Sequence, residues 1–250
     1  MVGQLLWRGL LAGVIAGLLA FGFARVFGEP QVDIAIAFEE QMAAAQPDDG
    51  APEEPEAVSR ETQAGIGLLT GVMTYSIAMG GIFSLVFASL YGRAGGNLSP
   101  RALSACLGAV FFLVLIVVPD LKYPPNPPAV GNPETIGIRT QLYFVVLVAS
   151  IAGAVLAFAL ARNLSHRWNR WNAAIVAGVA FIAFTAIVHA LLPAINEVPE
   201  NFPALNLYNF RMATLGLQAV IWTVLGLALG FLAERQLLQR GLYRTGALTR

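Results

Sequence analysis

The chain alternates between long apolar runs and short polar segments, and this pattern predicts membrane-spanning helices. A span needs about 20 mostly apolar residues. Six stretches meet this requirement: 9–27, 65–91, 102–118, 141–161, 172–192 and 212–233. The third is the shortest and is expected to stop at Pro119. The pattern therefore predicts an all-α, polytopic helical bundle, with residues 1–250 forming a single membrane domain.

Composition agrees with this interpretation and narrows the function. Of the 250 residues, 57% are hydrophobic and 12% are charged, whereas soluble domains carry about 25% charged residues. The chain has no phosphate-binding loop of the G-x-x-x-x-G-K-[ST] type, no H-E-x-x-H sequence and no G-x-S-x-G elbow. We therefore expect a transport role and no enzymatic one. We expect the lipid bilayer as a partner and no nucleic acid.

The distribution of charge predicts the orientation of the bundle. If the N-terminus is cytoplasmic and six spans alternate, the inner segments hold ten arginines and one acid, Glu234, and the outer segments hold five basic and fourteen acidic residues. Short cytoplasmic segments carry the excess of Lys and Arg. Both termini are therefore expected on the cytoplasmic side of the membrane.

The first span has an alternative interpretation as a cleaved secretory signal, with Arg8 as its basic region, which would leave five spans. Against this, the apolar run is long and no clear cleavage site precedes the acidic residues. Gly9, Gly13 and Gly17 also recur every four residues. Such a ridge of small residues lets another helix approach closely, which favours a retained span.

The outer connection 28–63 begins with a predicted amphipathic helix. At 100° per residue, Glu29, Asp33 and Glu40 form one stripe, and the opposing face is apolar, formed by Ile34, Phe38 and Met42. We expect this helix to lie on the membrane or on the top of the bundle, with its carboxylates directed outward. Residues 46–57, rich in acids and prolines, are expected to be a flexible linker.

Two later connections share a partial repeat. Residues 119–140 and 193–212 both begin with proline, then run Pro-x-Asn, a short gap and Pro-Ala, and both meet an arginine where the next span begins. This similarity predicts two related hairpins. The arginines at the starts of the second, fourth and sixth spans, Arg60, Arg139 and Arg211, are each expected to pair with an outer acid.

The candidate metal ligands are one histidine and a group of outer acids. His189 lies near the outer end of the fifth span, and imidazole is a common ligand of transition metals. The acids Glu29, Asp33 and Glu40, and then Glu197 and Asp120, could supply oxygen ligands for an ion such as Co²⁺. The alternatives are an interfacial histidine bonded to its neighbours and acids that outer loops simply tolerate.

Other residues with metal-binding or reactive side chains have structural interpretations. His166 lies in an inner cluster with Arg162, Arg167, Trp168, Arg170 and Trp171, which suggests anchoring at the membrane surface. Met73 and Met79 in the second span, and the lone Cys106, are expected to pack in the core. No tightly bound cofactor is expected.

Three long segments of the chain resemble the CbtA family, the predicted membrane subunit of a bacterial cobalt transporter. They are "LLAGVIAGLLAFGFARVFGEPQVDIAIAFEE" at 10–40, "LKYPPNPPAVGNPETIGIRTQLYF" at 121–144, and "LPAINEVPENFP" with "FRMATLGLQ" between 192 and 218. The resemblance implies uptake of Co²⁺, usually for cobalamin supply. It also implies a small single-span partner, CbtB, with histidines near its membrane segment. It supplies no ligand set.

The sequence thus favours a cobalt transporter subunit that collects cations at an acidic outer face and passes them along a path near His189 and the partner's histidines. A second copy of the chain is a further candidate partner. The alternative from a different class is a non-transporting membrane scaffold that docks another protein through its acidic outer loops. A response to Co²⁺ or Ni²⁺ separates the two.

Overall fold

The computed structural model describes residues 2–45, 58–93 and 98–243, and this part of the chain is helical with no strand. The predicted linker 46–57 lies outside the described residues. Six helical units are long and apolar enough to cross a membrane, which confirms the predicted fold class. They span Val2–Ala44, Arg60–Leu90, Pro100–Lys122, Pro133–Leu164, Arg170–Leu191 and Ala204–Gln239.

Three of these units are interrupted by a wider π-helical turn. The first contains α1 (Val2–Phe23), η1 (Ala24–Gly28) and α2 (Glu29–Ala44). The second contains α3 (Arg60–Thr62), η2 (Gln63–Gly67) and α4 (Leu68–Leu90), and the third contains α5 (Pro100–Phe112), η3 (Leu113–Val117) and α6 (Val118–Lys122). The last three helices are α7 (Ile136–Leu164), preceded by the 3₁₀ turn η4 (Pro133–Thr135), α8 (Arg170–Leu191) and α9 (Ala204–Gln239).

The third span continues through Pro119, so the expectation that it stops there is wrong. The N–H of Val118 donates to the carbonyl of Leu113, five residues back, instead of four. This wider turn accommodates the proline, which has no N–H and whose ring would clash in a regular helix. In η1 the N–H of Glu29 donates in the same way to Ala24, and Pro30 follows directly. A π-helical turn therefore allows two spans to continue past a proline.

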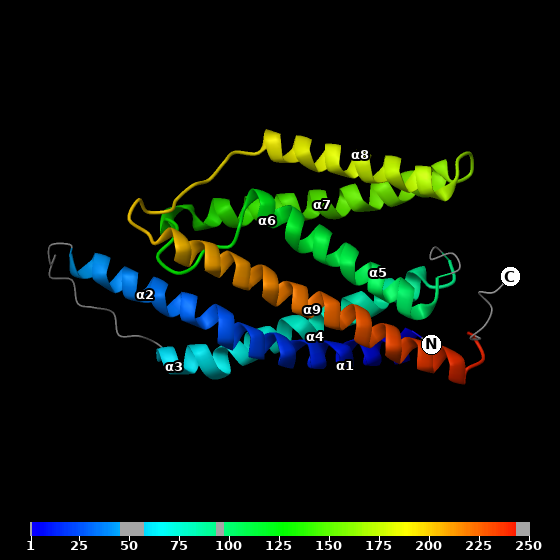
Figure 1. Ribbon diagram of the computed structural model, residues 1–250, viewed down its shortest axis with the longest axis horizontal. Helices are drawn as coiled ribbons and strands as arrows, with labels where there is room; N and C mark the ends of the chain where they lie inside the picture. The colour runs from blue at the N-terminus through cyan, green and yellow to red at the C-terminus, as the bar shows by residue number, and fades with distance from the viewer. Residues whose placement is uncertain (1, 46–57, 94–97, 244–250) are drawn as a thin grey trace.

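The acidic helix is not a separate element, because α2 continues α1 through η1 (Figure 1). Its apolar side packs on the connecting segments, where Ala35 is fully buried with Val130 and Phe202. Of the predicted apolar face, Phe38 joins this cluster, but Ile34 and Met42 remain 48% and 40% exposed. The predicted face is therefore only partly correct, because Phe38 is the one of its three residues that packs on the connecting segments.

The core of the bundle lies where α1, α4, α5 and α9 pack together. The ridge on α1 meets α4 as predicted, because a Cβ atom at Gly13 would lie 2.5 Å from the carbonyl oxygen of Ser76. Between α4, α5 and α9 the rings of Phe83, Phe111 and Trp222 pack in mutual contact, with centroids 5.2 to 6.3 Å apart. Small residues thus set close helix approach, and large aromatic residues fill the wider space.

The helices α7 and α8 form a hairpin beside this core (Figure 1). Helix α8 packs mainly on α7 and buries only Ala173 and Ala177. The two predicted hairpins are therefore not equivalent. The connection after α6 leads back to a packed neighbour, α7, whereas the connection after α8 leads to α9, which packs mainly on α5 and α1.

The two ends of the bundle differ in what they carry. The start of α1, the end of α9 and the turn between α7 and α8 lie at one end, here called the terminal end (Figure 1). The connections 123–135 and 192–203 lie at the other, here called the connection end (Figure 1). All the acids and the histidine singled out as metal ligands belong to segments at the connection end.

Candidate functional site

A cavity of about 460 Å³ opens at the connection end of the bundle. It lies between the end of the third span, the start of α7, the start of α9 and the two connections. Its polar side chains come from all of these elements: Asp120, Tyr123, Asn126, Arg139, Thr140, Tyr143, Asn196, Glu197, Arg211, Thr214 and Gln218. We call this the connection-end cavity.

One wall of the cavity is held by an ion pair between the start of α7 and the connection 192–203. The Nε atom of Arg139 lies 3.4 Å from Oε2 of Glu197, and the same oxygen accepts a 2.8 Å bond from the N–H of Asn132. Contact with the Thr135 hydroxyl, the Asn132 N–H and the Arg139 guanidinium lowers the pKa of Glu197. The predicted pairing of Arg139 with an outer acid is confirmed.

Gly131 allows this arrangement because it has no side chain. Its φ of +125° is a conformation that other residues rarely adopt, and a Cβ atom there would lie 2.7 Å from Nη2 of Arg139. The guanidinium therefore lies directly against the backbone of the connection, where Nη2 also donates to the carbonyl of Asn132 at 3.3 Å.

Arg211 forms the opposite wall, and its predicted ion pair is not found. Its Nη2 donates to Oδ1 of Asn126 at 2.8 Å, and its Nε donates to the carbonyl of Pro125 at 3.3 Å. Among the described residues no acid lies within ion-pair distance of it. Arg211 fixes the connection as predicted, but through neutral oxygen atoms, because the Pro-rich segment brings its backbone and not an acid to this helix.

The two connections are also tied to each other beside the cavity. The ammonium of Lys122 donates to the carbonyl of Leu192 at 2.8 Å, and the hydroxyl of Tyr123 donates to the carbonyl of Pro193 at 2.8 Å. Lys122 is the last residue of the third span and Tyr123 follows it, and both acceptors follow the end of α8. Hydrogen bonds and an ion pair thus join the elements that form the walls of the cavity.

Asp120 is the unpaired carboxylate of this cavity. It is half-buried on α6, and within the described residues it has neither an ion pair nor a side-chain hydrogen bond. Glu197, by contrast, is held by Arg139 and the Asn132 backbone. The cavity therefore contains one carboxylate that is free to accept a cation and one that is already engaged.

The acidic stripe on α2 is separated into two parts. Arg60 at the start of α3 pairs with both Glu29 and Asp33, with its Nη2 2.9 Å from Oδ1 of Asp33, which confirms the predicted role of this arginine. Glu29 is only 7% exposed, so the expectation that it faces outward is wrong. Its carboxylate forms an ion pair with Arg60 at the bundle surface. Glu40 is exposed on α2 about two turns after Asp33.

His189 is half-buried near the end of α8 and does not line the connection-end cavity. Its Nε2 atom is buried and has no hydrogen-bond partner within the described residues. The Lys122 ammonium bonds to the carbonyl of Leu192, one helical turn after His189. The nearby positive charge opposes binding of a cation by this imidazole alone.

The structure thus brings two of the six candidate ligands, Asp120 and Glu197, into one cavity. Among the described residues, no three His, Cys, Asp or Glu side chains come close enough together to hold a metal ion. The sequence reasoning did not single out Gln218, which lines the cavity and accepts a 3.4 Å hydrogen bond from the hydroxyl of Tyr75. A signal existed, because Arg211, Thr214 and Gln218 have helical spacing on one face of an apolar helix.

The two methionines of the second span pack against their neighbours as predicted. Met73 packs against Gly17 in the contact between α1 and α4, and Met79 packs against the core cluster. Cys106, in contrast, is exposed on α5, so its predicted place in the core is wrong. The helix turns its small residues toward α9 and this thiol away from it.

Comparison with known protein families gives one match over nearly the whole chain. The family model described as "Probable cobalt transporter subunit (CbtA)" matches residues 2–234. The match includes the first five spans, most of the sixth and both connections that form the cavity. No curated protein sequence and no solved structure matches the chain.

Proposed function

The chain belongs to the CbtA family of probable cobalt transporter subunits, and we propose that it takes up divalent cobalt through its connection end. With six apolar spans it is a multi-pass membrane protein. Membership among transporter subunits favours a non-enzymatic role. We further propose that it resides in the bacterial inner membrane with both termini in the cytoplasm, because short segments rich in arginine remain on that side.

The observation that carries this proposal is the free carboxylate of Asp120 in a polar cavity. Hard and borderline divalent cations accept carboxylate, amide and water oxygens as ligands. The Asp120 carboxylate would bind the ion, and the Gln218 amide and ordered waters would complete its shell. Glu197 would contribute charge while Arg139 keeps it in place.

The acids on α2 would act earlier, by concentrating cations near the mouth of the cavity. A surface of one charge sign raises the local concentration of counter-ions and speeds their capture, and salt weakens this effect. Glu40 is exposed and free for this role. Glu29 and Asp33 contribute less than the sequence suggests, because Arg60 neutralises part of their charge.

We propose that a partner subunit completes the path. A single carboxylate with neutral oxygens is a weak set of ligands for selecting a transition metal, and imidazole improves it. A small single-span subunit with histidines beside the membrane would supply such groups near His189. The family description as a subunit supports a complex, and a second copy of this chain is the other candidate member.

The test is uptake of radioactive cobalt by cells that lack their own cobalt transport. The chain alone, the candidate single-span partner alone and both together are compared at equal membrane abundance. We expect uptake only when both are present. In that background Asp120→Asn should raise the cobalt concentration for half-maximal uptake about tenfold or more, because a carboxylate ligand becomes neutral.

Glu200→Gln is the matched control, because Glu200 is an exposed acid of the connection 192–203 that does not line the cavity. It should leave uptake unchanged. Equal effects of the two substitutions would show that total negative charge matters and the cavity does not. No uptake in any combination, with both proteins in the membrane, would favour the scaffold alternative, in which the acidic connections dock another protein.

A further inference from the structure

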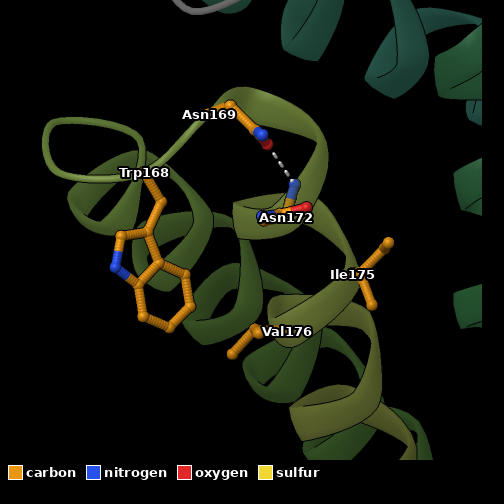
Figure 2. A pocket seen from close by; sticks show the side chains of 5 residues that line it. All are labelled: Trp168, Asn169, Asn172, Ile175 and Val176. Atoms are coloured by element: carbon orange, nitrogen blue, oxygen red, sulfur yellow. Dashed lines mark hydrogen bonds between the residues drawn. The ribbon is translucent and has the colours of Figure 1, made fainter.

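A second hollow lies at the opposite, terminal end, where the chain turns from α7 into α8. It has a volume of about 400 Å³ and is lined by Trp168, Asn169, Asn172, Ile175 and Val176. Figure 2 shows the indole of Trp168 extending beside the first turns of α8 on the side of Val176. Two of the five lining residues are asparagines and the other three are mainly apolar, so the hollow suits a ligand with both characters.

The amide groups at the top of the hollow have donors to spare. The side-chain oxygen of Asn169 accepts a 2.7 Å bond from the N–H of Asn172 and so caps α8 (Figure 2). Within the described residues, the NH₂ groups of both asparagines make no hydrogen bond. They are exposed and available to an acceptor such as a phosphate oxygen.

The surroundings of the hollow are strongly and exclusively basic. Arg162, Arg167 and Arg170 are exposed within one short stretch, and none of them forms an ion pair among the described residues. The sequence contains no Asp or Glu between Glu134 and Glu197. The α7–α8 hairpin therefore offers three guanidinium groups that no carboxylate of the described residues neutralises.

Below the hollow, α8 presents an apolar stripe that no protein element covers. Trp171, Ile175, Val179 and Ile182 recur at helical spacing and are 75%, 49%, 60% and 67% exposed. In a spanning helix such a stripe faces acyl chains. The stripe begins at the indole of Trp171, a residue type that favours the boundary between headgroups and hydrocarbon.

We propose that this hollow and its arginines bind one anionic phospholipid. The phosphodiester would lie among Arg167, Arg170 and the amides of Asn169 and Asn172, and an acyl chain would follow the stripe on α8. Charge complementarity identifies the headgroup as anionic, since a zwitterionic one brings its own cation to three unpaired arginines. The continuous apolar stripe identifies the ligand as a lipid, because a soluble phosphate would leave it unused.

The site gives the peripheral hairpin a role of its own. Helix α8 buries little of its surface against protein, so a lipid held at its first turn adds contacts that the chain itself does not supply. The proposal concerns binding only and is independent of cobalt transport, since the hollow and the connection-end cavity lie at opposite ends of the bundle.

The test uses native mass spectrometry of the purified full-length protein released from detergent micelles. Phosphatidylglycerol and phosphatidylcholine with identical acyl chains are added in equal amounts. We expect saturable retention of one phosphatidylglycerol and little phosphatidylcholine. Each arginine near an anionic headgroup contributes about a fivefold change in affinity, so R167Q and R170Q should each weaken retention about fivefold and the double variant about 25-fold.

The matched control is R93Q/R235Q, which removes two exposed arginines at the same end but away from the hollow. It should retain phosphatidylglycerol like the unchanged protein. Equal loss in both double variants, or equal retention of the two lipids, would overturn the proposal. Soluble glycerophosphoglycerol and inorganic phosphate serve as competitors, and full competition by inorganic phosphate would show a phosphate site in place of a lipid site. The single variants decide the matter if the double variant does not fold.

Discussion

The hydroxyl of Ser150 on α7 donates a 2.7 Å hydrogen bond to the backbone carbonyl of Val114 in the third span. In the π-helical turn this carbonyl would accept from the residue five positions on, which is Pro119 and has no N–H. An unpaired carbonyl in an apolar interior is costly. Ser150 therefore completes the helix at its proline and links the peripheral hairpin to the core.

Ser150→Ala should lower the free energy of unfolding by about 1 kcal/mol, since interhelical hydrogen bonds in membrane proteins contribute about that much. Unfolding of the purified protein in detergent micelles, followed by circular dichroism, measures the change. Ser89→Ala is the matched control, because that exposed hydroxyl bonds only to Val86 of its own helix, and it should change little.

The same bond predicts coupling with the proline. In a Pro119→Ala background the restored N–H can serve Val114, so Ser150→Ala should cost less than it does in the unchanged chain. An identical cost in both backgrounds would mean that the serine stabilises the helix pair for another reason.

The contact between α1 and α4 predicts a strong effect of one methyl group. Gly13→Ala places a Cβ atom 2.5 Å from the carbonyl oxygen of Ser76, so the helices must separate. We expect a loss of about 1–3 kcal/mol, as for overpacked cores, seen as a lower thermal midpoint. Gly22→Ala on the same helix meets no atom within 4 Å and should be neutral or stabilising, since alanine favours helices. Similar midpoints for the two variants would contradict the close contact.

The Arg60 pairs predict an asymmetry between single and double variants. Arg60→Gln leaves the carboxylate of Glu29, 7% exposed, without its cation, and should cost about 1–3 kcal/mol. Adding Glu29→Gln removes the stranded charge and should restore most of this loss. Denaturation of the two variants side by side measures it. A double variant less stable than Arg60→Gln would show that the carboxylate has another partner.

The Glu197 contacts predict a pH dependence of stability. The pKa of this carboxyl is lower in the folded protein than its ordinary value of 4.5. Its contribution is therefore complete above that value and is lost as the pH falls through the lowered pKa. The thermal midpoint of the unchanged protein should fall between about pH 5 and pH 3, and Glu197→Gln should make this part of the curve flatter. Glu200→Gln should keep the original slope; if it flattens the curve equally, the dependence belongs to the acidic surface as a whole.

The sequence predicted the spans well and their ends less well. Hydropathy alone locates an apolar run, because every residue of such a run must avoid water. It does not locate the end of a helix that continues into polar surroundings, as α1 does into α2. The third span passes Pro119 because a π turn and the Ser150 hydroxyl compensate for the missing N–H, and both depend on a neighbouring helix.

The candidate site shows the same division. Arg60 and Arg139 were expected to pair with outer acids and do so, because a charge beside an apolar bundle is stabilised by a nearby opposite charge. Arg211 instead donates hydrogen bonds to Asn126 and to a backbone carbonyl. Gln218, which was not among the residues predicted for the site, lines the cavity. Which acid meets which arginine depends on how the connections fold back over the bundle, and spacing along the chain does not contain that information.

The sequence by itself determined that this chain lies in a membrane, how many times it can cross and where its charges gather, because these follow from composition and local order. Only the tertiary structure decided which carboxylates are free. Glu29 and Asp33 are engaged by Arg60 and Glu197 by Arg139, whereas Asp120 lines the cavity without an ion-pair partner among the described residues. The reason is physical: a charge is available for binding only when packing has brought it no counter-charge, and packing joins residues from distant parts of the chain.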